Sequence, residues 1–546
     1  MEVEKSDAPA AQVLGQAMKD KYKNYSSCQR ASQGMRNSVR YVAIFVVFVV
    51  VAFLVSSQLN SSALSPFAVS ADRSEAYNVK VLPASLSDEE LNQLPKDTFS
   101  YMAMIDAGSS GCRAHVYRYG KLGTLTGPLY VLPQHDSLKV KPGLSSFASH
   151  PTDAGASLQG LVDFLKEQVP EADWAVTPIW LKATAGLRML EKAQSDAVLT
   201  SVRAFLLNKS SSPFLFRPSY ASIISGNEEG GFGWIAFNYL KRIIGPKKSG
   251  DAEPYAVVEM GGASSQVSQR APSAAAASLI PEQYRFSFSI EGESYDLYTH
   301  SYLGFGAEQG RAQLNKMLSL SSATAASSTA VQDPCLNTGY TREASAEPKE
   351  VYEGPEKMGV AGSSSQNPAM CAFTMGGIFG VVGADLSCPL AAPLPRSFGC
   401  THQPAFVAAS KNFLVFENFY YMASALAVPP TGGGNYSVVA ASSSSASFPL
   451  ITTASQIRQA AEMVCGLQWD SVQKSFPRDG QGKDVNLKLC FSSAYAYSFL
   501  VDGLKLPKDK QLTIQKEVGP SEIEWALGAA YKEAAELLKR TNLRPT

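Results

Sequence analysis

The sequence predicts an α/β protein, and three observations support this class. Stretches with the composition of strands alternate with stretches of helical periodicity, which is the pattern of an α/β fold. Two short segments rich in Gly and Ser, at 106–111 and 259–265, repeat the same order of residue types. The chain has 546 residues, of which 45% are hydrophobic, and this is enough for two or three domains with full cores.

Each Gly-Ser segment begins with a carboxylate at the end of an apolar run, Asp106 in the first and Glu259 in the second. Each then turns through glycines and hydroxyl residues into another plausible strand, so we predict two β-hairpins with a carboxylate at the turn. Glycine lets backbone N–H groups converge on an anion, and a carboxylate beside that anion suits a hard cation. One such turn alone would be an ordinary loop, but two could hold a polyphosphate and its metal between them.

Charge and histidine content exclude two other kinds of site. The chain has 48 basic and 48 acidic residues, so no basic face for nucleic acid is expected. The five histidines contain no close pair with metal-ligand spacing, so a zinc site is not expected either. They are at positions 115, 135, 150, 300 and 402.

The N-terminal region predicts a membrane anchor. Residues 1–40 are polar and basic, and residues 41–59 are uncharged and long enough to cross a bilayer of about 30 Å. The alternative is a cleaved signal peptide, but the polar lead is long for one. Because the basic cluster precedes the span, we expect a single-pass type II membrane protein with its catalytic part in the lumen or outside the cell. Residues 60–97 would be a stalk, and Golgi, vacuole and cell surface all remain open as the address.

Cysteines and sequons agree with an oxidising compartment. Cys28 precedes the anchor and Cys112 lies in the first Gly-Ser segment. An even set of six in the later part of the chain implies disulfides, and six free thiols are the alternative. The six are Cys335, Cys371, Cys388, Cys400, Cys465 and Cys490. Sequons at Asn60, Asn208 and Asn435 fit a glycoprotein.

Helices are predicted from apolar periodicity over 153–169, 198–206 and 231–244. Residues 521–524 have the pattern of a capping box that opens a helix through about Lys539. Small-residue segments interrupt the second half and are expected to be surface loops or insertions. They are 271–279, 318–330, 359–367 and 429–447.

Five stretches of the chain, in the same order, resemble the apyrases, the nucleoside triphosphate diphosphohydrolases that cut terminal phosphates from nucleoside tri- and diphosphates. They are 105–113, 182–188, 225–239, 259–264 and, near the end, 495–506 with 525–528. The likeness covers about residues 98–540. It implies the two-lobed fold shared with actin, heat-shock chaperone ATPases and sugar kinases, with one phosphate loop in each lobe. The lobes are then expected at 98–225 plus 521–546 and at 226–520.

The resemblance also implies roles for the residues that match its motifs. Asp106 and Glu259 would hold the water shell of a Mg²⁺ or Ca²⁺ ion, and Glu229 would be the general base. The attacking water would be placed by Thr184, Ser264 and Gln266. Phosphates would be bound by the loop residues and a nearby cation, namely Ser109, Ser110, Gly111, Arg113, Gly261, Gly262, Ala263 and Ser264. Tyr420 or Tyr421 would stack on the base, with a core position as the alternative for each.

Several positions are left open by the residues themselves. Arg113 and Arg188 are each either a phosphate-facing cation or a structural ion-pair partner. For Trp525, a packing role is favoured over contact with the substrate. Two positions depart from the family pattern: Glu259 stands where many members have Asp, and Cys112 replaces a more usual Ser or Thr, leaving a thiol that could be reactive. The resemblance implies a disulfide between Cys465 and Cys490, and Cys490 lies in a stretch, 486–491, whose composition predicts a strand. The other four late cysteines allow three connectivities.

The leading interpretation is a metal-dependent hydrolase that cleaves nucleoside phosphates by direct attack of water. Phosphoryl transfer is mostly positioning and charge stabilisation, so donors, a metal and one base suffice. The alternatives are a kinase of the same fold and a membrane-anchored nucleotide-binding or adhesion protein without activity. The preferred base, the number of phosphates and the oligomeric state are not indicated by the sequence.

Overall fold

A computed structural model describes residues 79–133, 136–322, 330–344, 351–355, 358–362, 368–383, 401–426, 449–476 and 484–542. The predicted cytoplasmic tail and anchor, and the stalk up to residue 78, lie outside the described residues. Within the described part, no helix is both long enough and apolar enough to cross a membrane.

The first half of the described chain is built on a seven-stranded sheet in the order β1-β3-β2-β6-β7, with β4 and β5 also paired to β3. Its central strands are a hairpin of β2 and β3, and β6 runs parallel to β2 on the other side. The strands are β1 (Val81–Leu82), β2 (Ser100–Ala107), β3 (Cys112–Leu122), β4 (Leu129–Val131), β5 (Ser137–Val140), β6 (Ile179–Ala183) and β7 (Ala221–Ile223).

The second half repeats this arrangement in a seven-stranded sheet of order β10-β11-β9-β8-β15-β17-β16. A hairpin of β8 and β9 again lies in the middle, and β15 runs parallel to β8. The strands are β8 (Ala256–Met260), β9 (Ser264–Arg270), β10 (Arg285–Ile290), β11 (Glu293–Leu303), β15 (Phe413–Glu417), β16 (Leu450–Thr453) and β17 (Gln511–Ile514). The structure therefore shows the internal repetition that the two Gly-Ser segments indicated.

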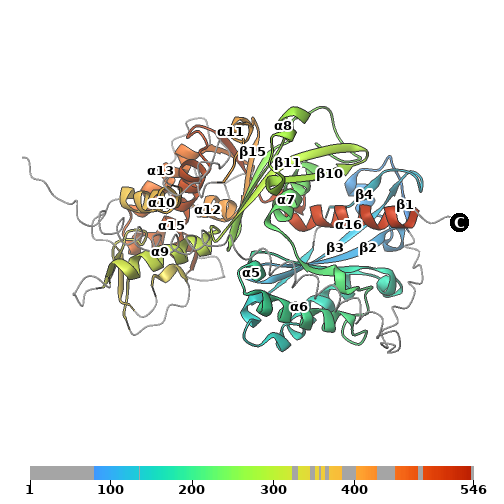
Figure 1. The fold of residues 1–546 in the computed structure, drawn as a ribbon, viewed down its shortest axis with the longest axis horizontal. Helices are drawn as coiled ribbons and strands as arrows, with labels where there is room; N and C mark the ends of the chain where they lie inside the picture. Colours follow the sequence, from blue (N-terminus) through green and yellow to red (C-terminus); the bar gives the residue numbers. More distant parts are fainter. Residues whose placement is uncertain are drawn as a thin grey trace, which may run out of the picture. The chain divides into compact units, whose positions relative to one another are not determined.

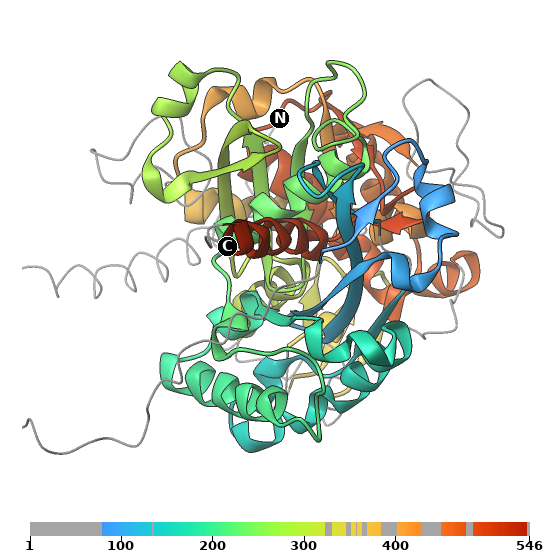
Figure 2. The same ribbon diagram turned by 90° about the vertical axis from the view of Figure 1, so that its right-hand side faces the viewer.

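Two helices join the halves. α7 (Gly226–Leu240) and α16 (Trp525–Asn542) pack against each other, α7 on β9 and β11 and α16 on β2 and β3 (Figure 1). Figure 2 shows α16 in dark red beside the blue strands of the first sheet. The two helices cross closely, because a Cβ on Gly528 would lie only 2.1 Å from the Phe232 carbonyl oxygen. One apolar core accordingly runs from the first sheet through both helices to β10 and β11.

The outer helices of the first half agree in part with the predicted periodicity. α6 (Lys192–Leu207) is longer than the predicted segment, and only α4 (Gln159–Gln168) is α-helical within 153–169. Short 3₁₀ turns precede α4, beginning at Pro151. Asn208, one of the predicted glycosylation sites, is exposed at the C-terminal end of α6.

The helices of the second half surround a separate apolar core. They are α9 (Ala307–Ser322), α10 (Pro368–Gly383), α12 (Asn418–Leu426), α13 (Ala454–Cys465) and α15 (Asp484–Ser498). A disulfide joins Cys465 to Cys490, as the resemblance implied, and a second joins Cys335 to Cys371. Of the remaining positions, Cys388 and Cys400 lie outside the described residues.

Two predictions of local structure are wrong. The capping box predicted at Ser521 is absent, because residues 521–522 form strand β19, which pairs with β18 (Glu517–Val518), and the helix begins at Trp525. A capping box does form at Ser225 and Glu228, so α7 begins five residues before the predicted start. The stretch 486–491, which has strand-like composition, lies within helix α15, because a short apolar run surrounded by core does not distinguish the two states.

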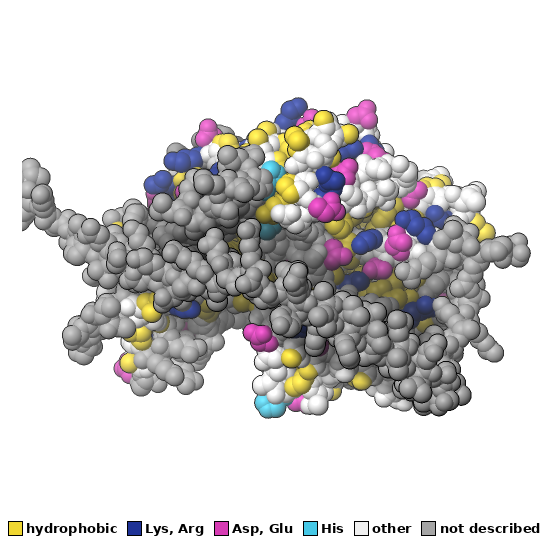
Figure 3. Space-filling view, in the orientation of Figure 1, with side chains coloured by type: hydrophobic (Ala, Val, Ile, Leu, Met, Phe, Trp, Pro, Cys, Tyr) yellow, Lys and Arg dark blue, Asp and Glu magenta, His cyan; other side chains and the backbone are white. Residues whose placement is uncertain are grey.

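Surface charge fits the balanced composition. On the face shown in Figure 3, the coloured Lys and Arg side chains are interspersed with Asp and Glu over the described surface.

Candidate active site

Both predicted hairpins are confirmed, and they match in register. Asp106 on β2 pairs with Arg113 on β3, and Glu259 on β8 pairs with Gln266 on β9. In each hairpin one more residue pair follows before the turn, so the two carboxylates occupy equivalent places beside equivalent loops. This equivalence means that a ligand held between the loops meets one carboxylate from each half.

The two loops face each other closely at glycine positions. A Cβ on Gly262, in the second loop, would lie 3.1 Å from Ser109 Oγ in the first loop. A Cβ on Gly186, at the start of the short helix α5 (Ala185–Arg188), would lie 2.9 Å from Ser109 Cα. These approaches leave backbone N–H groups of both loops free of side-chain obstruction, as an anion site needs.

The loops line one pocket with a volume of about 100 Å³. Every residue predicted to contact metal or phosphate through the two loops lines it, as do Thr184 and Glu229. Gln266 lies just behind this lining, whereas Tyr420 and Tyr421 do not contribute to it. The structure therefore brings together the first and second Gly-Ser segments, the Thr184 region and the Glu229 region from distant parts of the sequence.

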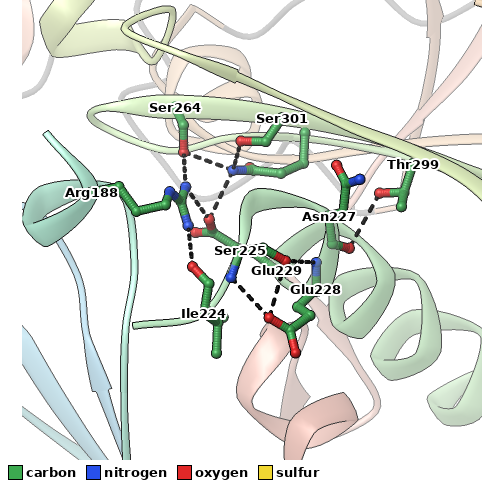
Figure 4. A network of polar contacts seen from close by, with 10 residues as sticks. Arg188, Ile224, Ser225, Asn227, Glu228, Glu229, Ser264, Thr299 and Ser301 are labelled. Carbon is green, nitrogen blue, oxygen red and sulfur yellow. Dashed lines mark hydrogen bonds and ion pairs between the residues drawn. The ribbon is translucent and has the colours of Figure 1, made fainter. Parts of the chain in front are cut away.

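Glu229 is buried on the first turn of α7, with only 6% of its surface exposed. Its Oε2 accepts a hydrogen bond from Arg188 Nη2 at 2.7 Å and another from Gln266 Nε2 at 3.0 Å (Figure 4). Burial raises the pKa of Glu229, and the Arg188 guanidinium opposes that rise. The direct ion pair with Arg188 is the stabilising charge that the structure shows beside this carboxylate.

Arg188 acts as a positioning residue in this arrangement. It donates to Glu229, to the Ile224 carbonyl oxygen at 3.1 Å and to Ser264 Oγ at 3.2 Å (Figure 4). Of the two roles left open for Arg188, the structure shows the ion pair. The guanidinium thereby links the base on α7 to the second phosphate loop.

Gln266 connects the same groups from strand β9. Its Nε2 lies within hydrogen-bond distance of three oxygens: Glu229 Oε2, Ser264 Oγ at 2.7 Å and Ser301 Oγ at 3.0 Å. Its Oε1 is buried and has no hydrogen-bond partner in the described part of the chain. A buried acceptor without a partner is costly, so this oxygen is suited to accept a hydrogen bond from a bound water or ligand.

The pocket is rich in carboxylates, which is the expected donor set for a hard cation. Burial raises the pKa of Asp106 to about 7, opposed by Arg113, and raises the pKa of Glu259 well above its usual range. Among the described residues, Asp106 Oδ1 and Glu259 Oε2 have no hydrogen-bond partner. A divalent cation or its water shell would satisfy both oxygens and offset the repulsion, so these residues fit the predicted metal site.

Sequence reasoning missed Glu417, a carboxylate in addition to Asp106, Glu229 and Glu259, and a lysine, Lys139, that also line the pocket. Lys139 pairs directly with Arg113 across β5 and β3, and two like charges in that position destabilise a sheet unless anions offset them. Arg113 is paired with Glu524 and, at 3.4 Å, with Glu522. In the described part of the chain Lys139 has no ion pair, which makes it the pocket cation available for phosphate. No local motif marks either residue, because the strand pairings that bring them to the pocket join distant segments.

The three aromatic candidates, Trp525, Tyr420 and Tyr421, lie in different environments. Trp525 lines the pocket, is only 5% exposed and stacks on Phe232 at a centroid distance of 6.5 Å, so it both packs and faces the site. Tyr421 is 46% exposed on α12, whereas Tyr420 packs against the core of the second half. Of the two tyrosines, Tyr421 is the more exposed.

Cys112 is buried at the start of β3, and burial raises the pKa of its thiol to about 12. The possibility of a reactive thiol is therefore wrong for the folded chain, since the nucleophile is the thiolate. We predict that Cys112 stays unlabelled when the native protein is treated with iodoacetamide at pH 8 and becomes labelled after denaturation. Peptide mapping by mass spectrometry checks this, and labelling of native Cys112 at the rate of a simple thiol would contradict it.

Comparisons with known proteins agree with this site. Residues 92–545 match the GDA1/CD39 (nucleoside phosphatase) family. A guanosine-diphosphatase of Schizosaccharomyces pombe is 30% identical over 454 residues, which cover 81% of this chain and 75% of the relative. A protein of Arabidopsis thaliana named probable apyrase 6 is 30% identical over 462 residues, covering 81% of this chain and 73% of the relative.

A crystal structure of nucleoside triphosphate hydrolases from Neospora caninum superposes with a TM-score of 0.55. The identity is 15%, and the match covers 81% of this chain and 93% of that one, which shows a shared fold. The α/β actin-like ATPase-type fold implied by the sequence is consistent with this neighbour and with the repeated sheets. From the match over most of its length, the chain belongs to the GDA1/CD39 (nucleoside phosphatase) family.

Proposed function

We propose that this chain hydrolyses the terminal phosphate of nucleoside di- and triphosphates by direct attack of water in the pocket between its two loops. The observation that carries the proposal is the arrangement of Glu229, Gln266 and Ser264. Glu229 and Ser264 both bond to Gln266 Nε2, while Gln266 Oε1 is buried without a partner among the described residues. A water there would donate one hydrogen bond to Glu229 and the other to Gln266 Oε1. On attack its oxygen bonds to the terminal phosphorus, Glu229 takes one proton, the second proton stays on the released phosphate, and the bond to the leaving phosphate oxygen breaks.

The phosphate chain would lie between the facing loops. Backbone N–H groups of both loops and the hydroxyls of Ser109, Ser110 and Ser264 are the donors, and Lys139 supplies positive charge. Thr184, which lies directly before helix α5 and lines the same pocket, would help to place the water. Because donors from both halves meet one ligand, the geometry supports catalysis by positioning and charge stabilisation.

A divalent cation fits this proposal, with Asp106 and Glu259 holding its water shell. When bound, Mg²⁺ or Ca²⁺ would neutralise phosphate charge and orient the anhydride. Five carboxylates and only two basic side chains line the described pocket, and one of those two, Arg113, is already paired with Glu524. A polyphosphate entering without a cation would therefore meet net negative charge.

We predict that phosphate release from a panel of nucleoside di- and triphosphates falls more than about 100-fold in excess EDTA, as expected when several kcal/mol of charge stabilisation are lost. Activity should return with added Mg²⁺ or Ca²⁺ and should survive a zinc-selective chelator. Colorimetric phosphate detection without an acceptor molecule also separates a hydrolase from a kinase. Full activity in EDTA would exclude the proposed cation, and no release from any nucleotide would exclude the hydrolase.

Base recognition is proposed to use Tyr421. Its exposed ring lies on α12, directly after the β15 strand end that lines the pocket, and any nucleobase offers a face for stacking. The packing of Tyr420 against the core makes it the weaker candidate.

We also propose that the chain is a single-pass type II membrane glycoprotein with its catalytic part in the lumen or outside the cell. The apolar run at 41–59 and the preceding basic residues support the anchor. The two disulfides and the exposed Asn208 sequon fit an oxidising, glycosylating compartment.

A further inference from the structure

Glu417 reaches the pocket from a strand that the motifs do not include. It is the last residue of β15, which runs parallel to β8, and Phe416 and Glu417 pair with Glu259 and Met260. Parallel neighbours end at the same edge of a sheet, so the end of β15 lies beside the second phosphate loop. Asn418 Nδ2 donates to the Met260 carbonyl oxygen at 2.8 Å and fixes this strand end to the loop.

The backbone at Glu417 is unusual. Its φ is 59°, in the left-handed region that residues other than glycine rarely adopt and that often marks functional sites. In a regular pleat Glu417 would share the face of its partner Met260, whose side chain lies in the core of the second half. Instead it lines the same pocket as Asp106 and Glu259. A strained backbone thus accompanies a carboxylate that faces the two predicted metal residues.

The surroundings of Glu417 also point to a bound cation. Its side chain lines the pocket together with Arg113 and Lys139. Among the described residues, the Glu417 side chain forms no hydrogen bond and no ion pair within 4.0 Å. Glu259, beside it, is only 7% exposed and its Oε2 has no partner in the described chain. This unpartnered oxygen points to a ligand independently of the acidic cluster.

We propose that Glu417 is a third carboxylate of the divalent-cation site, completing it with Asp106 and Glu259. The inference rests on the proposed function and deepens it, because it assigns to β15 a role in holding the cation or its water shell. Oxygen-rich sites bind hard cations more tightly as carboxylates are added. The competing role is a counter-charge to Lys139 and Arg113 with no part in cation binding.

The test measures Mn²⁺ binding to the nucleotide-free full-length chain. Binding is monitored by electron paramagnetic resonance, in which the signal of free Mn²⁺ decreases as the ion is bound. Glu417→Gln is expected to weaken Mn²⁺ binding at least about tenfold, because it removes one charged ligand. Glu517→Gln is the matched control, since it removes the same charge from an exposed position near Lys516, and it should change affinity less than about twofold. Glu417→Gln within twofold of the wild type would overturn the proposal and assign Glu417 to the counter-charge role.

A second variant, Glu417→Gly, removes the same carboxylate and is expected to fold stably, so the proposal can still be tested if Glu417→Gln folds poorly. Glycine accepts a φ of 59° without strain, so Glu417→Gly should unfold at a higher temperature than the wild type without cation. Its stabilisation by added Mn²⁺ should be smaller, because a ligand that binds only the folded state stabilises it by an amount that increases with the logarithm of its affinity. An unchanged Mn²⁺-dependent shift in Glu417→Gly would also overturn the proposal. Since neither readout uses hydrolysis, a wild-type chain that binds Mn²⁺ but releases no phosphate would instead contradict the proposed function.

Discussion

Glu229→Gln is expected to lower kcat by about 10²–10⁴-fold while leaving nucleotide binding nearly unchanged, because it removes a general base and little else. Glutamine has almost the same shape and its Oε1 can still accept the hydrogen bond from Arg188. The cost is that the buried Arg188 charge loses its carboxylate partner, so thermal unfolding and nucleotide affinity should be measured together with kcat.

The matched control for this experiment is Glu228→Gln, the neighbouring position. Glu228 accepts from the Ser225 backbone N–H in the capping box of α7, and glutamine serves equally in that motif. Glu228→Gln should therefore keep most of the wild-type activity. If Glu229→Gln retained more than half of normal kcat, the assignment of the base would be wrong.

Asp333→Asn is expected to destabilise the protein by about 3–5 kcal/mol, since it leaves a buried charge without its partner. Arg311 on α9 and Asp333 on β12 (Val331–Asp333) form an ion pair in which neither side chain is exposed. Asp333 Oδ1 also accepts from the Cys335 backbone N–H at 2.9 Å, which ties the pair to the Cys335–Cys371 disulfide. The measurement is the free energy of unfolding from denaturant titration.

Two comparisons sharpen that result. Replacing both partners, Arg311→Met with Asp333→Leu, should recover much of the loss, because a well-packed apolar pair often matches a buried ion pair. Breaking the exposed pair of Arg458 and Glu462 with Glu462→Gln should cost less than about 1 kcal/mol. Equal losses for Asp333→Asn and Glu462→Gln would show that burial does not control the effect.

The sequence predicted those parts of the site whose signals are local. A carboxylate, a glycine turn and a second strand lie within a dozen residues of one another, and both hairpins formed with the expected carboxylates. The positions of Thr184 and Glu229 came from the family motifs, and both line the pocket. The resemblance likewise implied the Cys465–Cys490 disulfide that the structure contains.

Lys139 and Glu417 could not be predicted in this way, because strand pairing places them. Lys139 lies opposite Arg113 through the β3–β5 pairing, and Glu417 lies beside Met260 through the β8–β15 pairing. The capping box predicted at Ser521 is absent for a similar reason. Glu522 and Glu524 form ion pairs with Arg113, and Ser521 belongs to strand β19. These longer-range contacts override the local sequence pattern. The same competition explains the strand-like stretch within α15, which packs among α9, α10, α12 and α13.

The central claim is that water attacks the terminal phosphorus directly, with Glu229 as its base. The measurement that tests this most directly is the stereochemical course of hydrolysis of a nucleotide whose terminal phosphorus is chiral through oxygen isotopes and sulfur. A single in-line displacement by water inverts that phosphorus, and inversion is the result expected here. Net retention would show two successive displacements through a covalent phosphoryl-enzyme, and it would contradict the role assigned to Glu229.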